Sequence, residues 1–374
     1  EVVLTQPLLR AAGQLVWRED LTAAERAYLY AERGHVRFLQ DLCLEVADAF
    51  WRLQVLQNRV ASGREEVRRT RFGLDQARAF LDLGRTTAND VFRAEVALLR
   101  ARQSLVDVTA AYDAALDGFK LDLNLPVDAA IAIVGEPPDR PLLAVDSRRA
   151  IDIALERRLD LMTARDRVAD ARRAVVLARR GILPDLDLDA RVGWSGDAER
   201  PWDDGVDGRP DYAVGLTLEI PFERHRERLD YAEQLTALSQ ARRAADLREA
   251  QVIREVQAAL RDLRQSEVSL TIQRRTVAQS RKRLVKSQMD FEAGAISNRD
   301  LLEAQRELRD AEVAFFRARI DYLAAELRLR RETGVLTVDA AGRWRAQLPA
   351  YLAPRGGEAA DGGADGKDGR GDAG

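Results

Sequence analysis

The sequence has 374 residues, with 59 Lys and Arg against 62 Asp and Glu, so its net charge of −3 gives no electrostatic reason to expect nucleic acid as a partner. Hydrophobic residues make up 46% and aromatic residues only 6%, a composition typical of long helices and coiled coils. One cysteine excludes an intramolecular disulfide, and two histidines supply little for metal binding or histidine-based catalysis. The sequence therefore predicts no catalytic residue, no metal site and no cofactor.

Membrane and targeting signals are weak. No run of 18 apolar residues is present, so the sequence predicts no transmembrane helix. Strands of a membrane β-barrel give a much weaker signal, which leaves that option open. The segment from Glu1 to Pro7 contains no basic stretch followed by an apolar stretch, and we expect a signal peptide to lie upstream.

The first predicted elements are the end of a strand at Pro7 and a hairpin of two long helices. Apolar residues recur at heptad spacing on both helices, which predicts a sustained helix–helix seam. The heptad positions are Val46, Leu53, Val60, Val67, Leu74 and Leu81 on the outgoing helix and Val91, Leu98, Leu105, Tyr112 and Phe119 on the return helix. A second row on the return helix is mostly alanine, and small side chains let helix backbones approach closely. We therefore expect a tightly packed antiparallel hairpin, with an outgoing helix about 90 Å long.

A glycine turn joins the two helices. Gly84 can take the positive φ that ends a helix, and Thr87 or Asn89 can cap the next helix. Asp90 would then lie near the positive end of the helix dipole. The order of helix, glycine, cap and helix predicts the turn at residues 83–88.

The middle of the chain is predicted to form one helix and two strands. An arginine-rich amphipathic helix spans Ser147 to Arg180 and stops before Pro184. The next two segments alternate apolar and polar residues, as strands with one apolar face do. Their apolar positions are Leu186, Leu188, Ala190, Val192 and Trp194, then Tyr212, Val214, Leu216, Leu218 and Ile220. A polar loop joins the two segments, so we expect a β-hairpin at residues 184–221.

Two environments fit this hairpin. Strands of about ten residues with Trp194, Trp202 and Tyr212 near the loop match lipid-facing strands with an interfacial aromatic girdle. A soluble hairpin packed on a core is an equal alternative on the strand pattern alone. The flanking helices favour the lipid-facing interpretation, because their apolar seams are committed to one another and leave no core for the hairpin.

The last helices repeat the first hairpin. Residues 255–329 match residues 45–119 at a constant offset of 210 with no gap. The turn positions Leu83, Gly84, Thr87 and Asp90 correspond to Ala293, Gly294, Ser297 and Asp300. The strand exits at Pro7 and Pro221 also correspond, at an offset of 214. The chain is therefore predicted to contain two copies of one unit.

These features together resemble the TolC-like outer membrane efflux proteins, from about Glu1 to Val338. The resemblance rests on the duplicated Gly-x5-Asp-x3-Ala turns at 84–94 and 294–304, the Leu-Pro-x-Leu-x-Leu strand entry at 183–188, and the two strand exits that end in proline. It implies a mainly α fold with a small β part. Two tandem repeats, each a β-hairpin plus very long antiparallel helical hairpins, would form a trimeric β-barrel and a periplasmic α-barrel.

The resemblance also implies a domain organisation. Residues 1–135 would form an incomplete first repeat, with the end of a strand and a long helical hairpin. Residues 136–338 would form the second, with a helix, the β-hairpin at 184–221 and a helical hairpin at 224–334. Nothing ahead of Glu1 corresponds to 147–209, so we expect an opening helix and a first strand upstream. Residues 339–374 form a C-terminal extension, expected to be disordered from Arg355 because Gly, Asp and Ala dominate it.

In the resembling family, acidic side chains at the periplasmic helix tips ring the pore, and a ring of three carboxylates selects cations. The implied gate positions are Asp300 and Glu303 in the acidic ring, Asp90 and Asn89 in the first repeat, and Phe291 at an aromatic position. Ile296 stands where the family has a gating arginine. Helix capping is an equal alternative for Asp90 and Asp300, and a solvated helix face is an equal alternative for Glu303.

Two surface roles follow from the same resemblance. The turns are candidates for docking a periplasmic adaptor, through Leu83, Gly84, Thr87, Ala293, Gly294 and Ser297. The lipid-facing strand positions would be Leu186, Leu188, Val192, Trp194, Tyr212, Val214, Leu216 and Leu218.

The implied function is a passive exit duct of a tripartite efflux or type I secretion system in a Gram-negative cell. The duct would lie in the outer membrane with its helical part in the periplasm. Its implied partners are a homotrimer, a periplasmic adaptor (membrane fusion) protein, an inner-membrane pump of RND or ABC type, and outer-membrane lipid, without nucleic acid. The alternative class is a soluble coiled-coil scaffold or adaptor, against which the alternating strand at 186–194 argues. An enzyme would need a clustered site that the sequence does not offer.

Overall fold

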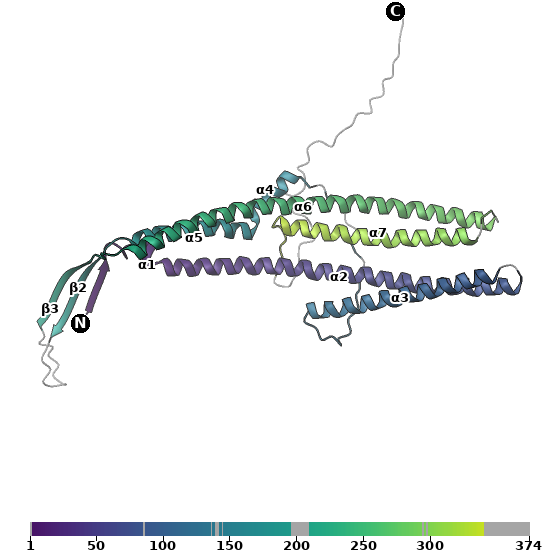
Figure 1. Cartoon of the computed structure of the whole chain (residues 1–374), viewed down its shortest axis with the longest axis horizontal. Helices are drawn as coiled ribbons and strands as arrows, with labels where there is room; N and C mark the ends of the chain where they lie inside the picture. The colour runs from purple at the N-terminus through teal and green to yellow at the C-terminus, as the bar shows by residue number, and fades with distance from the viewer. Residues whose placement is uncertain are drawn as a thin grey trace, which may run out of the picture. The chain divides into compact units, whose positions relative to one another are not determined.

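The computed structural model describes residues 2–84, 87–135, 137–138, 142–143, 145–195, 209–293, 295–296 and 298–339, with the backbone alone at 194, 195, 209, 210, 291, 292, 298 and 299. The elements are β1 (Val2–Pro7), α1 (Gln14–Trp17), α2 (Glu19–Asp82), α3 (Ala88–Asp122), α4 (Ser147–Arg157), α5 (Leu159–Gly181), β2 (Asp185–Ser195), β3 (Arg209–Glu219), α6 (His225–Glu292) and α7 (Asn298–Glu332). The fold is mainly helical with a small sheet, as predicted (Figure 1). None of the helices in the described ranges is long and apolar enough to cross a membrane.

The chain divides into two compact units. One unit, called here the sheet unit, comprises Glu1–Leu39 and Ala154–Glu255, and the other, the hairpin unit, comprises Gln40–Ile153 and Val256–Gly374. The sheet unit holds the three strands, α5 and the first parts of α2 and α6. The predicted C-terminal extension lies outside the described residues from 340 onward.

The two copies of the helical hairpin have matching bounds. The return helices α3 and α7 are each 35 residues long, and both of their ends lie 210 positions apart. The outgoing helices α2 and α6 contain 64 and 68 residues and also end 210 positions apart. At 1.5 Å per residue each outgoing helix is about 100 Å long, which confirms the predicted pair of long hairpins.

The hairpin unit is a layer one helix thick. Leu53 of α2 packs with Phe119 of α3 in one buried cluster. Arg328 of α7 lies 2.8 Å from Asp48 of α2, and Arg281 of α6 lies 3.0 Å from Glu312 of α7. The order across the layer is therefore α6, α7, α2, α3, as Figure 1 shows.

Two non-helical segments cover one face of this layer. The segment after α3 accepts a hydrogen bond of 2.9 Å from Gln54 Nε2 at the Gly135 carbonyl, and its Leu143 N–H donates one of 2.9 Å to the Tyr322 hydroxyl. The segment after α7 packs Leu336 against Ala47 in a second buried cluster. These contacts fix which face of α2 and α7 the two segments occupy.

The predicted helix from Ser147 to Arg180 is interrupted at Arg158, which corrects the sequence prediction. Arg158 has φ −67° and ψ 118°, an extended conformation between α4 and α5. In an unbroken helix, residues two positions apart point about 200° away from each other, so Arg158 and Asp160 could not meet. With the break, Arg158 Nη2 lies 2.8 Å from Asp160 Oδ2.

The strands form an antiparallel sheet in the order β1-β2-β3. Leu186 pairs with Leu218 and Leu188 with Leu216, which confirms the predicted hairpin. Residues directly opposite each other point to the same face, so Val2 and Leu4 of β1 share one face with the alternating apolar rows of β2 and β3. On the other face, the Asp189 carboxylate accepts hydrogen bonds from Thr5 and Thr217 at 2.7 and 3.1 Å. Among the described residues, β1 and β3 each have one edge without a strand partner.

The turn between α2 and α3 supplies a test of the backbone geometry. Gly84 has φ +69°, and a Cβ there would meet no atom within 4 Å, so Gly84→Ala should cost about 1 kcal/mol through backbone strain alone. Gly73 lies inside α2 with equally open space, and Gly73→Ala should instead stabilise the protein by about 0.5–1 kcal/mol. Denaturant unfolding of both variants in detergent, followed by circular dichroism, measures the difference. Equal effects of the two substitutions would contradict the positive φ at Gly84.

Candidate functional site

The first helix tip carries a complete capping box. Thr87 is the N-cap of α3, its hydroxyl accepts the Asp90 N–H at 3.3 Å, and the Asp90 carboxylate accepts the Thr87 N–H at 3.3 Å. This arrangement satisfies two free donors of the helix end. The capping role predicted for Asp90 is confirmed, while Leu83, Gly84, Thr87, Asn89 and Asp90 are all exposed.

The second helix tip presents two acidic side chains. Asp300 lies in the first turn of α7, Glu303 follows three positions later, and both are exposed. Positions three apart are neighbours on a helix surface, so these carboxylates share one side of α7. Ala293 is also exposed and Ile296 is half-buried. Gly294 and Ser297 lie outside the described residues, as does the side chain of Phe291.

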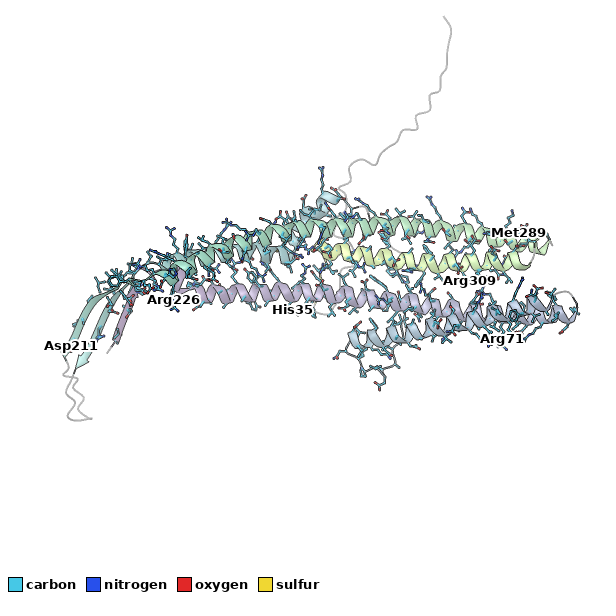
Figure 2. The ribbon with its side chains drawn as sticks, in the orientation of Figure 1. His35, Arg71, Asp211, Arg226, Met289 and Arg309 are labelled. Atoms are coloured by element: carbon cyan, nitrogen blue, oxygen red, sulfur yellow. The ribbon has the colours of Figure 1, made fainter. Side chains whose placement is uncertain are left out.

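The apolar face of the sheet is open to its surroundings. Tyr212, Val214, Leu216 and Leu218 of β3 are 71%, 77%, 67% and 55% exposed. On β2, Leu186 and Leu188 are half-buried between their neighbours and Val192 is 36% exposed, while the Trp194 side chain lies outside the described residues. Asp211 marks the loop end of β3 in Figure 2. No helix described in the sheet unit buries this row of β3, so the row requires an apolar environment that the described part of the chain does not provide.

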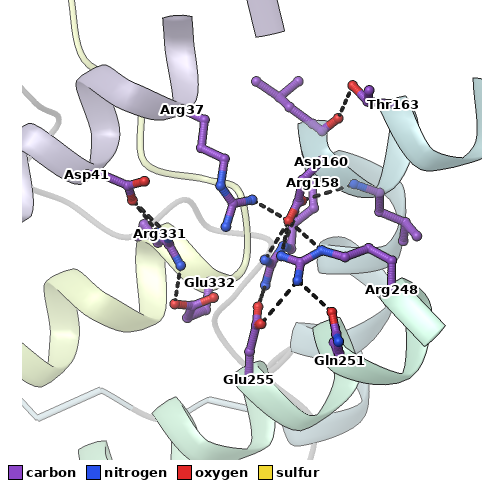
Figure 3. Close-up of polar contacts among 12 residues, drawn as sticks. Arg37, Asp41, Arg158, Asp160, Thr163, Arg248, Gln251, Glu255, Arg331 and Glu332 are labelled. Carbon is purple, nitrogen blue, oxygen red and sulfur yellow. Dashed lines mark hydrogen bonds and ion pairs between the residues drawn. The ribbon is translucent and has the colours of Figure 1, made fainter. Parts of the chain in front are cut away.

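An ionic cluster joins three helices of the sheet unit (Figure 3). Asp160 of α5 accepts Arg158 Nη2 at 2.8 Å and Arg248 Nε of α6 at 2.9 Å, and it also pairs with Arg37 of α2. Arg158 Nη1 lies 2.6 Å from Glu255 Oε2, and the Arg158 side chain is only 2% exposed. One buried guanidinium and one carboxylate therefore hold α2, α5 and α6 together.

The cluster keeps its members charged. Burial raises the pKa of Asp160, but the hydrogen bonds from Arg158 and Arg248 and the charges of Arg158 and Arg37 outweigh it, so the pKa lies well below the usual range. Burial lowers the pKa of Arg158, and the contacts with Asp160 and Glu255 reverse this and raise it. Because every member is paired with the opposite charge, the cluster positions helices rather than transferring protons.

Sequence reasoning missed this cluster. Its members are spread over residues 37, 158, 160, 248 and 255, and the arginine-rich segment around Arg158 reads as a solvated helix face. The only local signal was Asp160, an acidic residue suited to the first turn of a new helix, where its carboxylate accepts the Leu161 N–H at 3.0 Å.

Comparisons with known proteins support the same architecture. The family profile described as "Outer membrane efflux protein" matches residues 150–335. The alkaline protease secretion protein AprF of Pseudomonas aeruginosa is 26% identical over 303 residues, which is 79% of this chain and 62% of AprF. The outer membrane protein TolC of Vibrio cholerae is 24% identical over 336 residues, 85% of this chain and 73% of TolC. The chain thus spans less than two thirds of the length of AprF.

A solved structure shares the fold. The crystal structure of a membrane protein from Pseudomonas aeruginosa superposes with a TM-score of 0.68 at 24% identity, covering 88% of this chain and 76% of that one. This chain therefore shares with that membrane protein a fold of duplicated long helical hairpins and a small sheet. This chain belongs to the TolC-like outer membrane efflux protein family. It is accordingly a protein of the outer membrane with its helical part in the periplasm.

The ionic cluster predicts the effect of one neutral substitution. Asp160→Asn leaves three arginines facing an uncharged amide, so it should destabilise the protein by about 2–3 kcal/mol at pH 7. As a control, Glu65→Gln removes an exposed ion pair with Arg68 and should cost at most about 0.5 kcal/mol. Denaturant unfolding in detergent compares the two variants with the parent protein.

The same cluster has a defined pH dependence. The pKa of Asp160 is lower in the folded state than its unfolded value of about 4. Its contribution is therefore fully present above that value and is lost as the pH falls through the folded pKa. The stability difference between the parent protein and Asp160→Asn should shrink below about pH 4. A constant difference from pH 7 to pH 2 would contradict the assignment.

Proposed function

We propose that this protein is a passive outer-membrane exit duct of an efflux or type I secretion system. The observation that carries the proposal is the combination of a sheet with an exposed apolar face and a one-helix-thick layer of long hairpins in a chain of this family. The sheet suits an apolar membrane, and the layer suits the wall of a tunnel. The name of AprF refers to protease secretion, and the similarity of this chain to AprF supports secretion as well as efflux as its function.

Three copies would complete the duct. In the described ranges, β1 and β3 each leave one edge with unpaired backbone groups, which would require strand partners in a membrane. In a trimer, strands of neighbouring protomers would pair with these edges and help to close a barrel. The division into a first repeat at 1–135 and a second repeat at 136–338 is part of this proposal.

The partners follow from the position of the helix tips. The exposed turns around Gly84 and Ala293 are proposed to dock a periplasmic adaptor, which would link the duct to an inner-membrane pump of RND or ABC type. The energy for transport would come from that pump, since the duct performs no chemistry. Asp300 and Glu303 are proposed to form the acidic ring at the tips, where three copies would place carboxylates around one axis.

The assembly predicts a membrane-dependent trimer. The full-length protein should require detergent or lipid for solubility, and light scattering should give three times the protomer mass after subtraction of the detergent. In a planar lipid bilayer it should produce discrete ion-conducting steps. A stable monomer in detergent-free buffer without channel activity would instead support the soluble coiled-coil scaffold.

The acidic ring predicts a change in ion selectivity. Replacing Asp300 and Glu303 with Ala in the reconstituted channel should reduce its preference for cations and weaken block by multivalent cations by about tenfold. Asp113→Ala is the matched control, because Asp113 is an exposed carboxylate on α3 about 35 Å along the helix from Asp90. Unchanged selectivity and unchanged block in the double variant would refute the ring.

A further inference from the structure

The two faces of the helix layer in the hairpin unit differ in what they present. Gln54 and Gln57 of α2 donate to the carbonyls of Gly135 and Ile133 in the segment after α3. Arg52 and Arg59 each stand two positions away from these glutamines. Residues two apart on a helix point about 200° from each other, so the two arginines lie on the opposite face.

Helix α7 shows the same division. Arg319 donates to the Pro137 carbonyl and Tyr322 accepts the Leu143 N–H, so this side of α7 meets the covering segment. Arg317 and Ile320, again two positions away, line a hollow on the other side. One face of the layer is therefore covered by non-helical chain and the other is open.

The open face contains a groove between α2, α3 and α7. Its larger part has a volume of about 650 Å³, its smaller part has about 420 Å³, and both include Val55, Arg59 and Arg317. Apolar side chains such as Val55, Val313 and Ala314 form much of its surface. The charged residues that line it are Arg52, Arg59, Arg306, Arg309, Arg317 and Arg328, with Asp48, Glu66, Asp310 and Asp321. Positive charge therefore exceeds negative charge by two in each protomer.

Most of these charges are already paired. Arg328 lies 2.8 Å from Asp48 Oδ2, and Arg309 lies 3.6 Å from Glu66 Oε2. Within the part of the chain that the structure describes, Arg52 and Arg59 form no hydrogen bond and no ion pair. The Nη2 atom of Arg309, a residue labelled in Figure 2, is buried and forms its ion pair with Glu66 without a hydrogen bond. The groove thus offers the guanidinium donors of Arg52 and Arg59.

The orientation of the groove rests on the proposed function. A tunnel wall one helix thick has one face toward the lumen and one toward the outside. The segments around Gly135 and Leu336 add bulk to the covered face, and in a closed trimer three such additions would obstruct a lumen. The open face with Arg52 and Arg59 is the one that can line a passage.

We propose that Arg52 and Arg59 of the three protomers form a cationic belt inside the tunnel, which binds multivalent anionic groups of the cargo in passage. Charged rings select ions in pores, and low-dielectric walls focus their field. Guanidinium groups form two parallel hydrogen bonds with phosphate or carboxylate, so several such groups favour cargo that carries clustered negative charge. The belt residues lie within α2 on the open face of the layer, whereas the proposed acidic ring lies at the start of α7. The belt would bind anions and the ring would bind cations, at different positions along the tunnel.

The test uses tripolyphosphate as the probe anion in the reconstituted full-length channel. Tripolyphosphate is added to the compartment onto which the sheet end of the channel opens, and it should block the current of the parent channel. In the double variant Arg52→Gln/Arg59→Gln, the tripolyphosphate concentration that blocks half of the current should rise about tenfold in 0.1 M KCl. The reversal potential in a KCl gradient should shift to the value expected for a more cation-selective channel. In Arg52→Lys/Arg59→Lys block should stay within about twofold of the parent value, because the charge is kept.

Arg102→Gln is the matched control. Arg102 is an exposed arginine of α3 about 120° around that helix from Val108, which lines the groove. Equal block of the parent channel and the double glutamine variant would overturn the belt, and so would an equal loss of block in Arg102→Gln. Absence of any current from the parent protein would instead overturn the exit-duct function itself, on which the belt rests.

Discussion

The heptad seam is the constraint on which the structure depends. A layer one helix thick cannot bury side chains beneath it, so in the hairpin unit α2 and α6 bury apolar side chains mainly in narrow stripes that face the neighbouring helices. Leu53 and Val60 on α2 and Val256, Leu263 and Leu270 on α6 are all buried at seven-residue spacing. The alanines of α7 at 304, 311, 318 and 325 are buried as well, which brings the helix backbones close. Loss of this spacing in the hairpin unit would leave mainly ion pairs such as Arg281–Glu312 and Arg328–Asp48 to hold the helices together.

In the sheet unit, ion pairs contribute much of the contact between helices. Its helices bury few apolar side chains, and Arg158 with Asp160 provides the contact among α2, α5 and α6 that an apolar core provides elsewhere. An ionic joint is directional, since a guanidinium and a carboxylate meet in few geometries. It therefore fixes the break between α4 and α5, at the cost of desolvating charges that must all stay paired.

A layer one helix thick also has two faces that differ in the residues they present. The covered face of α2 and α7 is occupied by the segments around Gly135 and Leu336, and the open face carries the groove with Arg52 and Arg59. The tips carry the exposed carboxylates of Asp300 and Glu303, and the sheet carries the exposed apolar row of β3. Each surface is chemically distinct because helix and strand periodicity assigns neighbouring residues to opposite sides.

Periodicity and duplication in the sequence determined the two long hairpins, the turn at Gly84, a cap for α3 at Thr87 or Asn89 and the alternating strands, because each depends on residues close together in the chain. The positions named for a gate remain predictions, since they depend on copies around an axis. Only the tertiary structure decided the break at Arg158 and the pairing of Arg158 and Asp160 with Arg248 and Glu255. It also decided that Arg52 lies on the open face of the helix layer, where it lines the groove. These features join residues far apart in the sequence, and no local pattern of charge states which partner a buried arginine will meet.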